Sequence, residues 1–154
     1  MKFEMKKEEV YQALLAQLQG RVGELQQAWN ELLESNQQEG KSSAGDKHET
    51  AGAMVHLEME KLAKQLEEGR RQLSEVEKYN PDRIPESNQV QMGSLVHTTT
   101  GWYYLITSLG KIILNGEVCF VLSGASPLGS LMMTKRLRET IVRENIRMQI
   151  LSIE

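Results

Sequence analysis

The chain has 154 residues, of which 40% are hydrophobic and 25% charged, so it has room for one ordinary globular domain or two small units. Its formal net charge of −3 argues against a protein that coats free DNA or RNA, because such binding needs an excess of Lys and Arg. Cys119 is the only cysteine, which excludes an intramolecular disulfide framework and a zinc site made of thiolates.

The first ten residues are charged and lack the apolar core of a signal peptide. The most apolar stretch, residues 102–122, is interrupted by Gly, Lys, Asn and Glu, so it is not expected to cross a bilayer. We therefore expect a cytoplasmic protein.

The first half is predicted to contain two long amphipathic helices. In residues 4–35, apolar side chains recur every three or four positions and so share one helical face. These are Val10, Leu14, Leu18, Val22, Leu25, Trp29 and Leu32. A second stripe has heptad spacing and consists of Val55, Met59, Leu62, Leu66, Gly69, Leu73 and Val76. The glycine in this stripe predicts either a close approach of the two helices or a bend.

The segment between the helices, Asn36 to Gly45, is polar, contains two glycines and has no periodicity, which predicts a turn. Two helices joined by a short turn pack as antiparallel neighbours. Pro81 and Pro85 end the second helix, because proline cannot continue it. The pattern therefore predicts an antiparallel coiled-coil hairpin over residues 1–79 with its tip near 36–49, followed by a linker over 80–89.

Residues 90–154 change to the short β-branched and aromatic runs that are typical of strands. Strands are predicted at 95–98, 102–107, 112–114, 117–122, 140–142 and 146–153. Asn115-Gly116 predicts a hairpin with a type I′ turn, and Ser126-Pro127 predicts the start of a short helix that runs to about Met133. The result is an α+β fold in which one helix packs on an antiparallel sheet of five or six strands.

The histidines and the cysteine do not form a self-contained active site. The sequence has no phosphate-cradling glycine loop, no HExxH motif and no nucleophile elbow. His56 and His97 are interpreted as surface or packing residues, and Cys119 as a structural thiol. An enzyme that acts alone is therefore not expected.

Asp46 and Glu49, at the start of the second helix, form the pattern closest to chemistry. Asp-x-x-Glu at this place is typical of a capping arrangement, in which the carboxylates accept from exposed backbone amides. The alternative is that both carboxylates are presented to a partner as Mg²⁺ ligands. Two carboxylates alone would hold Mg²⁺ weakly, so the partner would have to supply the other ligands. The two interpretations are compatible.

The order of hairpin, linker and small sheet domain resembles the bacterial Gre transcript-cleavage and elongation factors (GreA/GreB-like). Residues 45–51 read Gly45-Asp46-x-x-Glu49-x-Ala51, similar to the family's GDLxENAEY. Residues 126–135 read SPLGSLMMTK, similar to the family's SPIARALIGK and identical at Ser126, Pro127 and Lys135.

The resemblance implies a hairpin that enters the secondary channel of bacterial RNA polymerase, and an FKBP-like C-terminal domain that docks on the channel rim. Docking would involve Ser126, Pro127, Leu128 and Lys135. Asp46 and Glu49 would help to place the second Mg²⁺ and a water, so that the polymerase's own active site cleaves backtracked RNA. The protein would then be a monomeric accessory factor that contacts RNA indirectly and shares Mg²⁺ only in the complex, with no cofactor bound stably alone.

The sequence also departs from the family pattern. Thr50-Ala51-Gly52-Ala53 stands where the family has Asn-Ala-Glu-Tyr, Thr134 replaces a glycine, and Arg138-Glu139 stands where Gly-Asp is expected. Two alternatives therefore stay open. One is a regulator that binds the secondary channel without stimulating cleavage, and the other is a helical-hairpin interaction protein unrelated to transcription.

Overall fold

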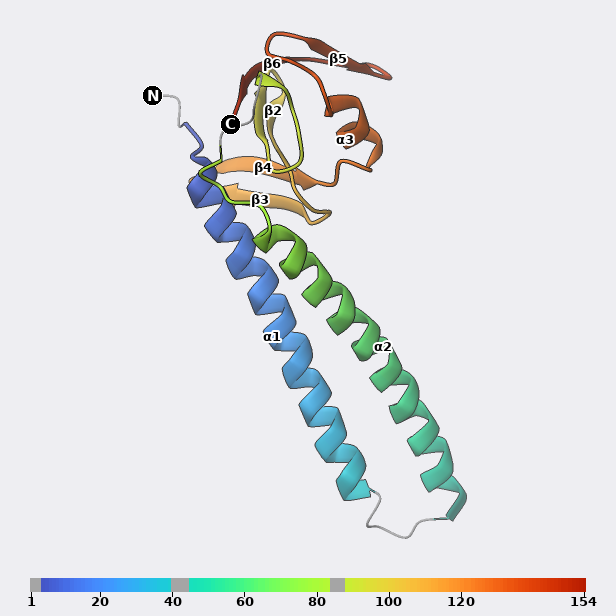
Figure 1. Ribbon diagram of the computed structural model, residues 1–154. Helices are drawn as coiled ribbons and strands as arrows, with labels where there is room; N and C mark the ends of the chain where they lie inside the picture. Colours follow the sequence, from blue (N-terminus) through green and yellow to red (C-terminus); the bar gives the residue numbers. More distant parts are fainter. Residues whose placement is uncertain (1–3, 40–44, 84–87) are drawn as a thin grey trace. The chain divides into compact units, whose positions relative to one another are not determined.

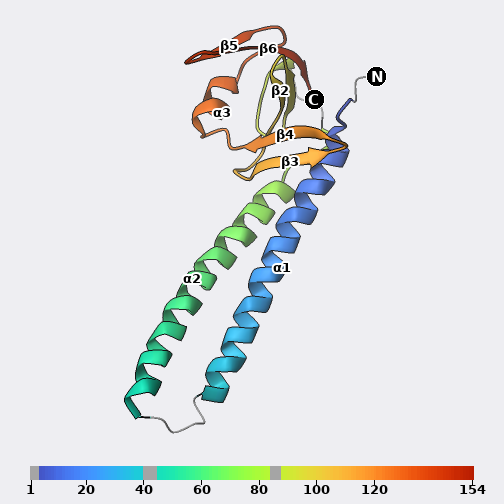
Figure 2. The same ribbon diagram turned by 180° about the vertical axis from the view of Figure 1, so that it is seen from behind.

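The computed structural model describes residues 4–39, 45–83 and 88–154, with the backbone alone for 38–39 and 45–51 (Figures 1 and 2). The chain forms two compact units. Ala16–Leu73 is called the hairpin unit here, and Met1–Leu15 together with Ser74–Glu154 the sheet unit. The predicted boundaries at 79/80 and 89/90 stay predictions. No helix within the described ranges is long and apolar enough to cross a membrane.

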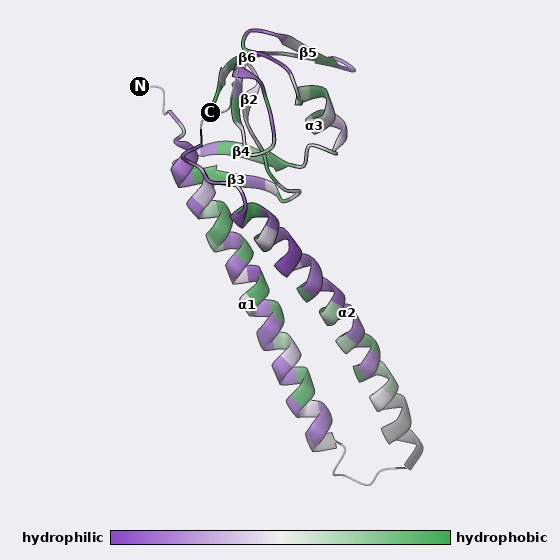
Figure 3. Ribbon diagram, in the orientation of Figure 1, coloured by the Kyte–Doolittle hydropathy of each residue, from purple (hydrophilic) through white to green (hydrophobic). Residues whose placement is uncertain are grey.

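The hairpin unit is built from most of two helices, α1 (Lys7–Glu39) and α2 (Gly45–Glu77), whose start and end respectively belong to the sheet unit. Val22 of α1 lies against Gly69 of α2, and Trp29, which comes later in α1, lines a pocket with Leu66, which comes earlier in α2. The two helices therefore run in opposite directions. The predicted antiparallel hairpin is therefore confirmed. Figure 3 shows hydrophobic bands that alternate with hydrophilic ones along α1, as an amphipathic helix requires.

The predicted end of the first helix at Ser35 was wrong, since α1 continues to Glu39. Residues 36–39 read Asn-Gln-Gln-Glu, and Gln and Glu favour helices even where no apolar face needs to be buried. A loss of hydrophobic periodicity therefore marks the end of packing rather than the end of the helix. The rest of the predicted tip, residues 40–44, lies outside the described residues.

Gly69 lets the two helices approach closely. An added Cβ at this residue would lie 3.1 Å from Cγ2 of Val22, which is tighter than ordinary packing. Neighbouring seam residues Leu62 and Leu66 are buried. Of the two interpretations of this glycine, the structure thus supports a close approach.

The sheet unit contains six strands and one short helix. The strands are β1 (Leu95–Thr98), β2 (Gly101–Leu105), β3 (Gly110–Leu114), β4 (Glu117–Leu122), β5 (Thr140–Arg143) and β6 (Ile146–Ile153), and the helix is α3 (Pro127–Met132). The strand order is β3-β4-β2-β1-β6-β5. β3 and β4 are joined at Asn115 and Gly116, which have φ of 51° and 81°, so the predicted turn with two positive φ values is confirmed.

The sheet is mixed, so the prediction of a purely antiparallel sheet was wrong. β2 and β4 run parallel, with Tyr103 opposite Phe120, while the other pairings between named strands are antiparallel. The β3–β4 hairpin places its second strand beside β2. Alternation of apolar and polar residues predicts that a segment is a strand but does not predict which strand it pairs with.

β2 is buried on both faces of the sheet. Tyr103 and Leu105 belong to a core on one face, which Met132 of α3 also joins. Tyr104, from the opposite face of β2, is fully buried and lies near Tyr11 of α1. The Tyr11 hydroxyl donates a hydrogen bond to the carbonyl of Val76 at 3.2 Å, which ties the start of α1 to the end of α2 within this unit.

Gly23→Ala is expected to raise the free energy of unfolding by about 1 kcal/mol, because this exposed glycine lies inside α1 with nothing within 4 Å of an added Cβ. The free energy of unfolding of Gly69→Ala is expected to be about 1 kcal/mol lower than that of Gly23→Ala, because the added Cβ would press on Val22. Chemical denaturation of both variants measures the difference. Equal gains at the two positions would contradict the close approach of the helices.

Candidate functional site

The predicted tip carboxylates, Asp46 and Glu49, lie in the first five residues of α2, which begins at Gly45. Negative charge is favourable there because the first backbone N–H groups of a helix carry partial positive charge. The side chains of residues 45–51 lie outside the described part of the structure. The roles of both residues as caps and as metal ligands therefore stay predictions.

The predicted docking segment begins at Ser126, which caps α3. Its Oγ accepts a hydrogen bond from the backbone N–H of Gly129 at 3.0 Å and donates one to the carbonyl of Ser123 at 2.7 Å. Pro127 follows at the start of the helix, where its fixed φ is already helical. The prediction of a Ser-Pro helix start is confirmed.

Gly129 is required by the close packing of this segment. An added Cβ would lie 2.0 Å from the carbonyl oxygen of Ser123 and 2.7 Å from Oγ of Ser126. Since the contact with Ser123 is to backbone, no side-chain rotation would relieve it. The loop before α3 and the first turn of α3 therefore form one tightly built element.

Ser126, Pro127 and Leu128 line a groove with a volume of about 410 Å³. The other side of the groove includes Phe120 of β4 and Arg143 of β5. Three of the four predicted docking residues thus lie together, beside an aromatic ring and a guanidinium that the sequence analysis did not select. The alternation of β4 offered a signal for Phe120, which points away from the buried side chains on either side of it.

Phe120 gives the groove an exposed aromatic surface. Its side chain is 44% exposed, and its ring packs against that of Tyr103 with centroids 5.6 Å apart. Tyr103 in turn belongs to the buried core under α3. The ring is therefore held in place by a buried neighbour while part of its surface faces solvent.

Lys135, the fourth predicted docking residue, does not line this groove. Its Nζ lies 4.0 Å from a carboxylate oxygen of Glu139, and its carbonyl accepts a hydrogen bond from the N–H of Val90 at 2.8 Å. The backbone hydrogen bond joins the segment after α3 to the segment before β1, whereas the ion pair lies within the segment after α3. The structure shows a connecting role for Lys135, and its docking role stays a prediction.

Thr134 and Arg138 have φ of 69° and 72°, in the left-handed region that favours glycine. These are the two positions at which the Gre pattern carries glycine and this sequence does not. A β-branched residue such as threonine is especially unusual there. The backbone thus adopts, at both positions, the conformation for which the family pattern supplies glycine.

The remaining candidates have packing roles. Burial raises the pKa of the Cys119 thiol to about 12, so it stays protonated at neutral pH, as a structural cysteine does. His97 stacks on Trp102 with ring centroids 4.0 Å apart, and His56 is exposed on α2. Among the described residues, we find no group of three or more His, Cys, Asp or Glu that could hold a metal. The side chains of the predicted tip are not among these residues.

No protein-family model and no curated protein matches the chain. Among solved structures, it is similar to the crystal structure of Thermus aquaticus Gfh1, with 15% sequence identity over 96% of this chain and 94% of that one and a TM-score of 0.37. It is also similar to the GreA factor homolog 1 (Gfh1) protein of Thermus thermophilus, with 15% identity, coverage of 95% and 93%, and a TM-score of 0.33. A further structure of the transcription factor Gfh1 has 14% identity, coverage of 99% and 96%, and a TM-score of 0.33. At these identities and TM-scores, the likenesses carry no conclusion about function.

Thr134→Gly and Arg138→Gly are each expected to raise the free energy of unfolding by roughly 1 kcal/mol, because glycine removes the cost of a left-handed backbone. Thr140→Gly is the matched control. This exposed threonine of β5 is not among the residues with positive φ, so glycine there is expected to destabilise the protein. Thermal or urea unfolding measures all three variants. A loss of stability in Thr134→Gly as large as that in Thr140→Gly would contradict the assignment.

Proposed function

We propose that this protein is a Gre-like accessory factor of bacterial RNA polymerase. In this proposal the α1–α2 hairpin enters the secondary channel, and the groove beside α3 docks on the channel rim. The protein would act as a monomer in the cytoplasm. It would have no active site of its own and would work through the catalytic centre of the polymerase.

The observation that carries the proposal is the left-handed backbone at Thr134 and Arg138. Both positions depart from the family pattern, which has glycine there. A chance match of short motifs would not place left-handed φ at these two positions, since non-glycine residues rarely adopt it. The order of hairpin and sheet is also as the resemblance implies, and the segment similar to the family's SPIARALIGK has the Ser126 cap that its Ser-Pro pattern predicts.

The proposed chemistry resides at the tip. Asp46 and Glu49 would offer carboxylate oxygens to a Mg²⁺ that is held mainly by the polymerase, because two carboxylates alone leave most of its octahedral positions unfilled. A second metal ion held there by the polymerase with Asp46 and Glu49 would supply the water activation and charge stabilisation that phosphodiester hydrolysis needs. Cleavage of backtracked RNA would thus be the polymerase's reaction, stimulated by the factor.

A second candidate is a channel regulator that does not stimulate cleavage. The observation in its favour is the segment Thr50-Ala51-Gly52-Ala53, which lacks the asparagine, the glutamate and the tyrosine of the family motif. Without these groups, fewer polar atoms are available to orient a water or a metal. A regulator of this kind would keep the docking groove and the hairpin and would lack the catalytic effect.

The tip is tested with stalled, backtracked complexes of bacterial RNA polymerase in the presence of Mg²⁺. The unmodified protein is expected to shorten the RNA, and Asp46→Asn and Glu49→Gln are expected to slow shortening by tenfold or more with binding retained, because each removes one charged ligand. Glu58→Gln, an equal charge change at an exposed residue of α2 outside the tip, is the control and should act like the unmodified protein.

Three further outcomes of this assay have separate meanings. Shortening that persists without Mg²⁺ would contradict the proposed chemistry. Binding without any shortening by the unmodified protein would support the regulator. Absence of binding to the polymerase would leave only an interaction protein unrelated to transcription.

The groove is tested by Phe120→Ser, which is expected to weaken binding to the polymerase by tenfold or more, because an aromatic ring in a docking groove buries much of its surface on association. Ile113→Ser is the matched control, since Ile113 is 62% exposed on the adjacent strand β3 and does not line the groove. Affinity is measured by titration of labelled protein with polymerase. Equal losses in both variants would exclude the groove as the docking site.

A further inference from the structure

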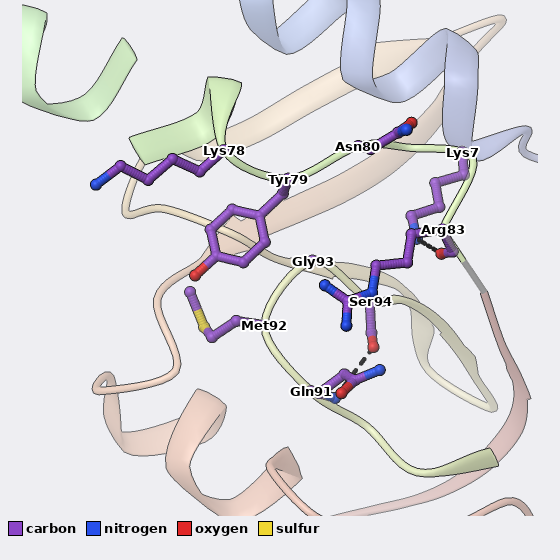
Figure 4. A pocket seen from close by; sticks show the side chains of 9 residues that line it. All are labelled: Lys7, Lys78, Tyr79, Asn80, Arg83, Gln91, Met92, Gly93 and Ser94. Atoms are coloured by element: carbon purple, nitrogen blue, oxygen red, sulfur yellow. Dashed lines mark hydrogen bonds between the residues drawn. The ribbon is translucent and has the colours of Figure 1, made fainter. Parts of the chain in front are cut away.

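The sheet unit contains a second cavity, separate from the groove beside α3, with a volume of about 300 Å³. Its described lining comes from the start of α1, the segment that follows α2 and the turn that precedes β1 (Figure 4). Three of the lining residues are cations, namely Lys7, Lys78 and Arg83. No described residue of the lining is acidic. The described lining therefore carries three positive charges, with the carboxylates of Asp82 and Glu154 near Lys7.

Lys7 is the most buried of the three cations, with 8% of its surface exposed. Its ammonium donates a hydrogen bond to the carbonyl of Arg83 at 3.1 Å, and no other partner is found for it in the described ranges. Lysine has three N–H donors, so this buried charge has spare capacity. Burial lowers the pKa of Lys7, and the nearby carboxylates of Glu154 and Asp82 oppose this shift in part.

Arg83 adds a second charge beside Lys7. Its side chain forms no ion pair within the described part of the chain, although a guanidinium has five N–H donors. Figure 4 shows Arg83 extending toward Gly93 and Ser94, on the side of the pocket where Lys7 lies, whereas Lys78 extends to the far side of Tyr79. Lys7 and Arg83 thus form the charged part of the pocket.

Ser94 contributes a neutral donor. Its side chain is completely buried, and its Oγ accepts a hydrogen bond from the N–H of Gln91 at 3.0 Å. That contact fixes the oxygen and leaves the hydroxyl proton without an acceptor among the residues that the structure describes. A buried hydroxyl with an available proton fits an anion that accepts hydrogen bonds.

We propose that this pocket binds a single phosphate group through Lys7, Arg83 and Ser94. Phosphate carries about two negative charges at neutral pH and several acceptor oxygens, which match an ammonium, a guanidinium and a hydroxyl. The volume lies at the small end of ligand sites, which favours a small anion over a large organic ligand. This site is independent of the proposed docking groove and of binding to polymerase.

The test is a titration of the full chain with inorganic phosphate at constant ionic strength, followed by the NMR amide signals of Gly93 and Ser94. A saturable shift is expected for the unmodified protein. Arg83→Gln, which changes an exposed side chain, is expected to weaken binding by tenfold or more. Lys111→Gln on β3 is the matched control, because it removes an equal charge outside the pocket and should bind as the unmodified protein does.

Lys7→Met removes the buried ammonium and keeps most of the apolar stem. Phosphate is expected to raise the melting temperature of the unmodified protein above its value in chloride of equal ionic strength, and to have no such effect on Lys7→Met. If Lys7→Met does not fold, Ser94→Ala and Arg83→Gln are measured in its place with the same expectation. A shift that does not saturate, or equal affinity in Arg83→Gln and Lys111→Gln, would overturn the proposal.

Inorganic phosphate and adenosine monophosphate are compared in the same titration to identify the source of the phosphate group. Binding of inorganic phosphate alone supports a closed site for the free ion. Binding of both with similar affinity supports a site that takes the phosphate end of a larger molecule. Binding of neither overturns the site.

Discussion

Burial of β2 on both faces is the constraint on which the arrangement of the sheet unit depends. Tyr103 and Leu105 pack into the core that includes Met132 of α3, and Tyr104 is buried from the other face near Tyr11. A sheet that is covered on both sides needs a helix on one side and the ends of α1 and α2 on the other. The groove beside α3, the start of α3 and the cationic pocket are all built next to this buried strand or to the segments that cover it.

The features of the fold that the sequence predicted correctly do not depend on this burial. β1, β4 and β6 begin and end at the predicted residues, and Asn115-Gly116 and Ser126-Pro127 have the predicted turn and cap. These signals are local, since strand patterning, positive φ and helix capping each depend on a few adjacent residues. Their chemistry can therefore be inferred without knowing which elements pack together.

What could not be predicted depends on contacts that are distant in sequence. The parallel pairing of β2 with β4 brings Tyr103 beside Phe120, and β5 adds Arg143 to the same groove. No local pattern places these residues next to Ser126. The charged pocket likewise joins Lys7 to Arg83 across 76 residues, and nothing in the spacing of either residue indicates the other. The first helix continues past its predicted end because Gln and Glu favour a helix even where no apolar face is buried.

The departures from the family pattern divide into two kinds. At Thr134 and Arg138 the sequence lacks the glycine of the pattern while the backbone has the left-handed conformation that glycine favours, which costs stability. At residues 50–53 the change removes polar groups from the tip, where chemistry would take place. The first kind concerns the segment proposed to bind polymerase, and the second concerns the segment proposed to stimulate RNA cleavage.

The central claim is that the hairpin enters the polymerase secondary channel, and the most direct measurement is a cryo-electron microscopy structure of the full chain bound to a backtracked elongation complex. We expect α1 and α2 to lie inside the channel, with Asp46 and Glu49 beside the catalytic Mg²⁺ and the groove at Phe120 against the channel rim. A complex in which the chain is bound elsewhere and the channel is empty would contradict the account.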